Sequence, residues 1–159
     1  MKRMKLVAVV AAAFMTVAGM ARAANIVIVN NDGVGEGFND PTPAAPVGGN
    51  WGTTIGQQRL IACTYAAEIW GACLQSNVTI PVNAQMNPLT CTAGSAVLGS
   101  AGATTAHFNF AGAPLANTLY PQALANSLAG VDLSPAQPDI NATFNSNLGN
   151  VGCLTGTFF

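Results

Sequence analysis

The order of hydrophobic periods between residues 25 and 86 constrains the fold more than any other feature of the sequence. Residues 25–30 (N-I-V-I-V-N) are a short β-branched apolar run, which predicts a strand buried on both faces. Residues 54–75 repeat apolar side chains at helical spacing, and residues 77–86 alternate apolar and polar side chains. A strand, a helix and a strand in this order predict a right-handed βαβ crossover with parallel strands.

The helical stretch carries its own start signal. Thr54 as N-cap and Gln57 three residues later form a capping-box pattern, and a helix of about five turns should follow. Because Tyr65 and Trp70 belong to this helix, we expect both to be packed, with Glu68 solvated. In the following strand, Pro81 should lie where its missing N–H faces no neighbour. The expected apolar stripe contains Leu60, Cys63, Ala67, Trp70 and Leu74, widened by Ala66, Ile69 and Cys73.

The remaining segments predict shorter elements joined by loops. Residues 31–52 are rich in Gly, Pro, acids and amides, which indicates a long irregular loop. The other expected elements are a loop at 91–103, a third strand at 104–110, a short helix at 121–129 stopped by Gly130, and an edge strand at 139–145. The predicted class is α+β, a mixed twisted β-sheet with one long helix on a face.

The first 23 residues have the pattern of a secretory signal peptide. A basic start is followed by an apolar stretch, and Ala21-Arg22-Ala23 is typical of a cleavage site. The apolar run is shorter than the roughly 20 residues that a membrane span needs. We therefore expect a signal peptide at 1–23, a single α+β domain at 24–159, and a secreted, extracellular product that crosses the periplasm and has no membrane contact after cleavage.

Charge beyond the leader excludes several functions. Arg59 is the only cation after residue 23, and it stands against six acids, so this part of the chain carries a formal charge of −5. A basic footprint for nucleic acid or an anionic membrane is therefore absent. A Walker-type phosphate site is also excluded, because no Lys remains to form one.

Four cysteines in an exported chain favour disulfides. Cys63 and Cys73 share the predicted helix and would lie about 15 Å apart, too far to pair with each other. Either both bond elsewhere, or Cys91 pairs with Cys153 and the helical cysteines remain as buried thiols.

Candidate chemical sites are sparse. His107 is the only histidine, so neither a conventional zinc site nor a Ser-His-Asp arrangement is indicated, and we expect it on a polar strand face. A possible calcium site gathers oxygen ligands on one glycine-rich loop, although its spacing is not that of an EF-hand. Of Trp51, Tyr65 and Trp70, only Trp51 falls on a loop, which is a weak signal for a sugar-binding surface. The candidate calcium ligands are Asp32, Glu36, Asn39 and Asp40.

Several stretches together resemble a known family: residues 26–41, 56–91, 116–126, 138–148 and 152–156. They are similar to the region after the signal in secreted bacterial proteins that carry a protease-associated (PA) domain and look like zincin-type zinc metallopeptidases. The resemblance implies the N-terminal subdomain of a zincin, in which a twisted sheet and a long helix precede a helix bearing H-E-x-x-H. It also implies a Cys91–Cys153 disulfide.

No H-E-x-x-H motif occurs in this chain, so no catalytic or zinc-binding residue is carried over. The apolar end at Phe158 and Phe159 suggests a chain truncated at its C-terminus. The expected function is the inactive front portion of a metallopeptidase-like protein, with the missing catalytic half, which would hold zinc, or the PA domain as partner. The alternatives are a self-contained secreted module that binds polysaccharide or calcium, and a structural surface protein.

Overall fold

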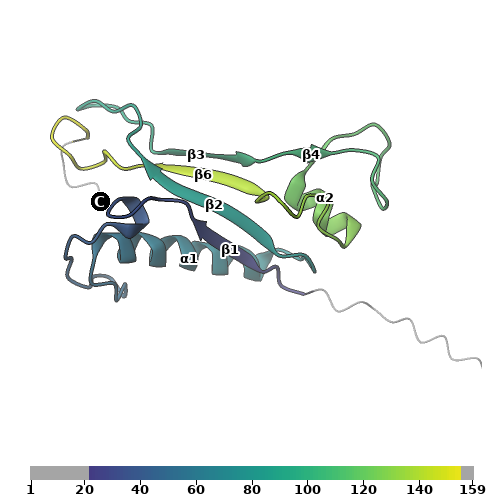
Figure 1. Cartoon of the computed structure of the whole chain (residues 1–159), viewed down its shortest axis with the longest axis horizontal. Helices are drawn as coiled ribbons and strands as arrows, with labels where there is room; N and C mark the ends of the chain where they lie inside the picture. Colours follow the sequence, from purple (N-terminus) through teal and green to yellow (C-terminus); the bar gives the residue numbers. More distant parts are fainter. Residues whose placement is uncertain (1–21, 155–159) are drawn as a thin grey trace, which may run out of the picture.

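The computed structural model describes residues 22–154, which form a four-stranded sheet with a long helix on one face (Figure 1). The strand order is β1-β2-β6-β3. β1, β2 and β6 are parallel, and β3 is antiparallel to β6. The predicted class, a mixed α+β fold with one long helix, is therefore confirmed. Most of the predicted leader and the apolar chain end lie outside the described residues. The bounds are β1 Ile26–Asn30, β2 Ile80–Asn87, β3 Gly99–Ala103 and β6 Ile140–Asn145.

Helix α1 (Ile55–Cys73) begins where the capping residues predict. The Thr54 hydroxyl accepts a hydrogen bond from the Gln57 backbone N–H at 3.2 Å. The return half of the capping box is shifted by one residue, because the Gln57 side-chain oxygen accepts from the backbone N–H of Thr53 rather than of Thr54. Both contacts satisfy donors at the start of the helix, so its first turn is well fixed.

α1 is much less buried than its apolar stripe predicts. Its buried residues are Gly56, Ala67 and Gly71, whereas Tyr65 is 64% and Trp70 62% exposed. The expectation that both aromatic residues are packed is therefore wrong. The reason is that α1 lies against β1 and the short 3₁₀ helix η1 (Gly37–Asn39) and leaves much of the sheet face uncovered.

β1 is half-exposed, which corrects the expectation of a strand buried on both faces. Val27 and Val29 point away from the helix and are 41% and 43% exposed. β1 is an edge strand with a helix on one face only, so its apolar run does not mean that both of its faces are buried. It pairs with β2 in parallel, as the strand–helix–strand order predicts. Pro81 lies one residue before the pairing of β2 with β6 begins, where its missing N–H breaks no ladder bond.

The segment between β2 and β6 differs most from expectation. β3 falls within the predicted loop 91–103, and only Ala106–His107 of the predicted strand at 104–110 is extended, as β4. β4 pairs with β5 (Tyr120–Pro121) in a separate two-stranded sheet. Because β3 pairs with the outer side of β6, β6 is a central strand and not the predicted edge.

Helix α2 (Gln122–Ala129) confirms the predicted short helix. Pro121 is its N-cap, and Gly130 ends it in the left-handed conformation with a φ of 70°. A side chain is strained at this φ, which explains why glycine is an effective stop. α2 packs against β4 and β5, at one end of the large sheet (Figure 1).

The two faces of the sheet have opposite chemistry. The face away from α1 carries amides and threonines that hydrogen-bond across strands, including Asn83 to Asn141 and Gln85 to Thr143, both at 3.3 Å. The face towards α1 carries the core, in which Phe38, Ala84 and Ala142 are buried. Among residues 22–154, no helix is long and apolar enough to cross a membrane.

Candidate functional site

An apolar groove runs between α1 and the open part of the sheet. Its volume is about 610 Å³, and every side chain that lines it is apolar. Trp70 and Leu74 lie on the helix side, and Ile140 and Phe144 of β6 lie on the sheet side. The groove exists because one helix covers the β1 edge of a sheet that is four strands wide. We call this feature the sheet groove.

Small side chains form much of the sheet groove. Ala62 and Ala66 of α1 face Ala101 of β3 and Ala142 of β6 across it. Alanine side chains are small, so the backbone of a partner can approach closely. Trp70 and Leu74 at the rim of the groove are exposed and offer large apolar surfaces. An exposed contiguous apolar surface of this kind in a folded domain marks a site of interaction. The chemistry therefore fits an apolar partner, and the Cys63 thiol is the most reactive group in the lining.

Asp32, a candidate calcium ligand, instead ties two distant segments together. One carboxylate oxygen accepts from the backbone N–H of Phe38 at 2.7 Å, and the other accepts from the backbone N–H of Met86 at 2.8 Å. The carboxylate thus joins the loop after β1 to the end of β2. Such charge-assisted bonds are stronger than neutral ones, so Asp32 has a clear structural role.

The other candidate calcium ligands also make contacts within the loop. Glu36 accepts from the Gly33 N–H at 3.0 Å, and the Asn39 amide donates to the carbonyls of Asp32 and Gly33. Asp40 accepts from Thr42 and lies 3.6 Å from Arg59. The hydrogen bonds to Thr42, followed by the charge of Arg59, lower the pKa of the Asp40 carboxyl. Calcium binding by this loop stays a prediction.

His107 lies in β4 beside Ser134, with the ring Nε2 3.3 Å from the serine hydroxyl. A serine hydroxyl that the sequence did not predict therefore lies beside His107, but the triad is not complete. Within the described residues, no carboxylate is hydrogen-bonded to the other ring nitrogen, and Asp132 accepts from the Ser134 backbone N–H. An orienting acid is what fixes the histidine of a catalytic triad, so this pair lacks that function.

A buried polar network beneath His107 was not predicted from the sequence. Gln122 and Asn126, one turn apart on α2, and Asp139, just before β6, are at most 1% exposed. Asn126 donates to Asp139 at 2.8 Å, whereas the second Asp139 carboxylate oxygen and the Gln122 side-chain oxygen have no partner. The only sequence signal was an acid directly before an alternating strand, which usually indicates a turn.

Burial is the largest influence on Asp139. Removal from water raises the pKa of its carboxyl, while the neighbouring Gln122 amide lowers it, and the charges of Asp132 and His107 act in opposite directions. A buried carboxyl with a raised pKa is a common feature of functional sites, and also of structural networks. Here the carboxyl faces α2 and is fully buried, which favours the structural role.

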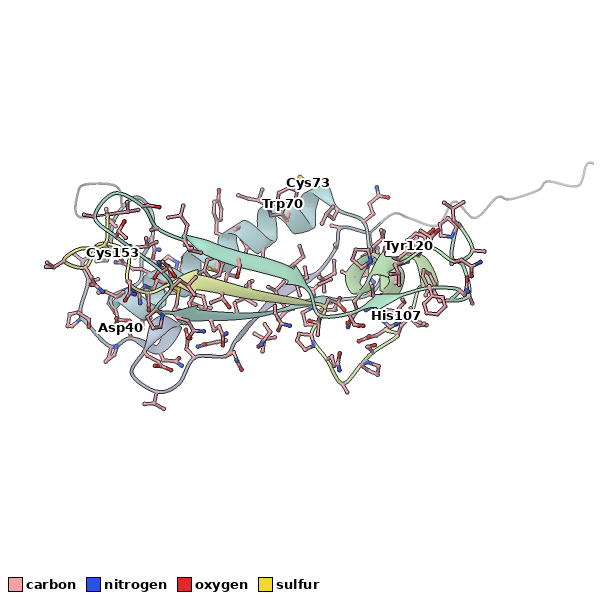
Figure 2. The ribbon with its side chains drawn as sticks, turned by 90° about the horizontal axis from the view of Figure 1, so that it is seen from above. Asp40, Trp70, Cys73, His107, Tyr120 and Cys153 are labelled. Carbon is pink, nitrogen blue, oxygen red and sulfur yellow. A yellow bond between two sulfur atoms is a disulfide. The ribbon has the colours of Figure 1, made fainter. Side chains whose placement is uncertain are left out.

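The cysteines partly follow the second predicted arrangement, in which Cys91 pairs with Cys153 and the two helical cysteines remain as buried thiols. Cys91 and Cys153 form a disulfide with a Cα–Cα distance of 5.1 Å, and it joins the segments that follow β2 and β6 (Figure 2). Cys63 and Cys73 are free thiols, but only Cys63 is partly buried, and its burial raises the pKa of the thiol. Cys73 is exposed, so the expectation that both are buried is wrong for that residue.

Metal ligands do not converge in the described part of the chain: residues 22–154 contain no group of three or more His, Cys, Asp or Glu side chains placed to hold an ion. Comparisons with family models, with curated proteins and with solved structures find no match to this chain.

Proposed function

We propose that this chain is the non-catalytic front portion of an exported protein that resembles zincin-type metallopeptidases. In this role the sheet and α1 form a docking surface for an apolar helix of a catalytic half, or for the PA domain, of the same protein. The single observation that supports the proposal is the sheet groove, which leaves a four-stranded sheet only partly covered by its helix.

The size and lining of the sheet groove support a helix as the occupant. Burial of apolar surface contributes roughly 25 cal/mol per Å², so an exposed groove of this size leaves several kcal/mol of possible stabilisation unused. A helix is about 10 Å wide and presents an apolar stripe that alanine-lined walls can receive. The strand order and the single helix on one face are also compatible with the front of a zincin.

Zinc does not fit the residues described here. The only histidine, His107, has a serine hydroxyl at its Nε2, and the acids of the loop after β1 already accept backbone hydrogen bonds. We therefore derive no catalytic step for this chain. The disulfide supports the proposed export, because disulfides persist in oxidising compartments.

The first experiment is to sequence the gene beyond codon 159. We expect an open reading frame that encodes a helix with H-E-x-x-H. An immediate stop codon with no such motif in the adjoining frame would contradict the proposal. Metal analysis of the purified 159-residue chain should find no stoichiometric zinc.

The second experiment tests whether the sheet groove is a docking surface. The 159-residue chain should bind the hydrophobic dye ANS, and the longer protein should not, because its own helix fills the groove. Trp70→Ser, at an exposed position on the rim, should weaken dye binding, whereas Trp51→Ser, outside the groove, should not. Equal dye binding by the short and long proteins would refute the role of the groove.

A further inference from the structure

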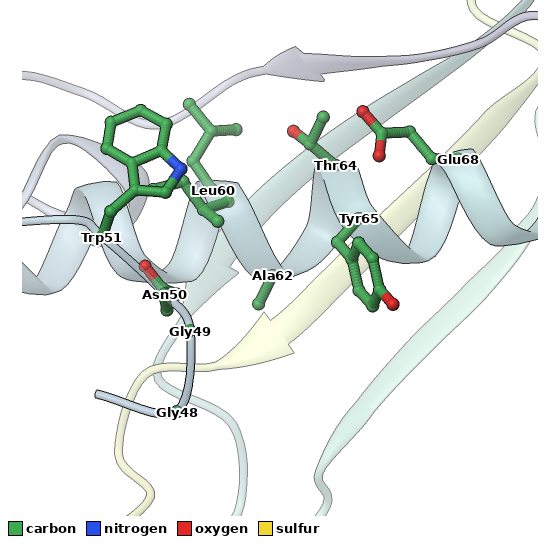
Figure 3. Close-up of a pocket in the computed structure, with 10 residues that line it drawn as sticks. Gly48, Gly49, Asn50, Trp51, Leu60, Ala62, Thr64, Tyr65 and Glu68 are labelled. Carbon is green, nitrogen blue, oxygen red and sulfur yellow. The ribbon is translucent and has the colours of Figure 1, made fainter. Parts of the chain in front are cut away.

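A second hollow lies on the outer side of α1 and has a different chemistry from the sheet groove. Its volume is about 800 Å³, and both polar and apolar side chains line it. Trp51, 73% exposed, lies beside Leu60, and Tyr65, 64% exposed, follows further along the helix with Thr64 and Glu68 (Figure 3). We call this hollow the Trp51 cleft.

Trp51 is exposed but firmly placed. The preceding Asn50 accepts from the Gly52 N–H at 3.0 Å and donates to the Gln58 carbonyl at 2.8 Å. The Gln58 amide in turn donates to the carbonyls of Ala45 and Gly52. The loop on both sides of the tryptophan is thus fastened to the first turns of α1. These bonds fix the backbone on both sides of Trp51, and its exposed ring does not contribute to the core, so part of the ordering cost of binding is already met.

The aromatic residues are spaced for more than one ring. Trp51 lies beside Leu60, and Tyr65 is five residues further along α1, about 7.5 Å along the helix axis (Figure 3). This separation is longer than a single pyranose ring. Aromatic rings bind the apolar C–H face of a pyranose, and polar side chains beside them bind its hydroxyl groups.

Polar groups project from α1 on the side of Trp51, whereas Tyr65 projects towards the opposite edge of the cleft (Figure 3). Thr64 and Glu68 are one turn apart and exposed, and within residues 22–154 neither side chain has a hydrogen-bond or ion-pair partner. The Glu68 carboxylate can accept from sugar hydroxyl groups. It would repel an anionic sugar, and Arg59 is the only cation beyond residue 23. The charge of the chain therefore favours a neutral saccharide.

We propose that the Trp51 cleft binds a neutral oligosaccharide, with the Trp51 indole stacked on one sugar ring, Tyr65 against the next, and Thr64 and Glu68 hydrogen-bonded to hydroxyl groups. This inference is independent of the sheet groove and of any peptidase half. The structure also strengthens the weak sequence signal for sugar binding at Trp51. Tyr65 is not packed in the core, so Trp51 has an exposed aromatic partner.

Intrinsic fluorescence gives a direct test, because the chain has only two tryptophans. In Trp70→Phe, Trp51 is the only tryptophan, and selective excitation of tryptophan leaves the two tyrosines silent. We titrate this variant with β-1,4-linked oligomers of glucose and of N-acetylglucosamine, and with a β-1,4-linked oligouronate as the anionic control. We expect a saturable change in Trp51 emission with at least one neutral oligomer at concentrations up to about 1 mM, and none with the uronate.

Calorimetry on variants of the whole chain completes the test. Trp51→Ala should weaken binding of that oligomer at least tenfold, and Tyr65→Ala should also weaken it. Trp70→Ala, which changes an exposed aromatic residue of the sheet groove, should leave binding unchanged. Because all three side chains are exposed, the variants should fold. A flat titration with both neutral oligomers, equal binding of the uronate, or equal loss in Trp70→Ala would overturn the proposal.

Discussion

Replacing Asp139 by Asn should stabilise the protein at neutral pH. Asp139 is fully buried, and one carboxylate oxygen accepts from Asn126 while the other has no partner. The Gln122 side-chain oxygen is also buried without a partner. An asparagine keeps the acceptor for Asn126 and brings an amide N–H that can donate to Gln122. The substitution therefore removes a buried charge and can satisfy an unpaired acceptor with a single hydrogen bond.

The magnitude follows from the cost of an unsatisfied buried group. Such a group costs about 1–3 kcal/mol, so Asp139→Asn should raise the free energy of unfolding by about that amount at pH 7. For a domain of this size the corresponding rise in Tm is about 3–10 °C. The assay is urea unfolding followed by circular dichroism, together with thermal melts, on the oxidised protein.

The pH dependence gives a second signature of the same cause. Burial raises the pKa of Asp139 in the folded protein above its ordinary value of 3.8. As the pH rises from 3.8 through the folded pKa, the unfolded chain loses this proton first, so the stability of the wild type falls. The gain in Asp139→Asn should thus be full above the folded pKa, shrink as the pH falls, and disappear below 3.8.

Asp132→Asn is the matched control, because Asp132 belongs to the same network but is exposed. It should show no stabilisation at pH 7. A loss of stability in Asp139→Asn at pH 7 would refute the reasoning, since it would mean that the Gln122 amide nitrogen, rather than its oxygen, faces the carboxylate.

Three further predictions follow from the fold. Replacing Cys91 and Cys153 together by Ser opens a loop with a sequence separation of 62 residues and should lower the free energy of unfolding by about 4 kcal/mol in urea titrations. Thr54→Ala removes the helix cap and should cost about 1 kcal/mol, seen as a lower urea midpoint at unchanged slope. Gly56→Ala places a Cβ 2.6 Å from the backbone of η1 and should cost about 2–3 kcal/mol, although alanine favours a helix elsewhere. Gly102→Ala, with no atom within 4 Å, is its control and should change stability little.

Each of these predictions has an outcome that would contradict it. Unchanged stability without the disulfide would mean that it does not constrain the unfolded chain. An unchanged urea midpoint in Thr54→Ala would show that water replaces the cap. A stabilised Gly56→Ala would show that α1 can move away from η1 without loss.

The sequence predicted the elements whose local signals agree with their tertiary environment. α1 has a cap and a helical period, and α2 has a proline start and a glycine stop, so both were located within a few residues. β2 and β6 alternate clearly, because one face of each lies over the apolar side of the sheet. The parallel pairing of β1 with β2 follows from the predicted crossover geometry.

β3 could not be predicted because its residues have no strand preference. Gly99–Ala103 reads G-S-A-G-A, without a β-branched or aromatic side chain, and every residue is exposed. The segment is extended because β6 offers it a free edge, a tertiary cause that no local pattern records. The prediction of β6 as an edge strand failed for the same reason.

Only part of the candidate sites was visible in the sequence. The acids do lie on the predicted loop, but the hydrogen bond that Asp32 accepts from the Met86 N–H depends on the approach of β2. The exposure of Trp70 and Tyr65 depends on how much of the sheet α1 covers, and helical periodicity does not report that. The sheet groove and the Trp51 cleft both arise from this incomplete cover.

The backbone at Ala24 connects the predicted maturation of the chain with the end of α1. Its N–H donates to the carbonyls of Gly71 and Leu74, both at 3.0 Å, and the residue is nearly buried. With the predicted cleavage after Ala23, this amide would become a terminal ammonium group at the carboxyl end of a helix. The helix dipole favours a positive charge there by about 0.3–1 kcal/mol. Removal of the leader would then do more than release the protein: it would place a cation on carbonyls that the fold has already aligned.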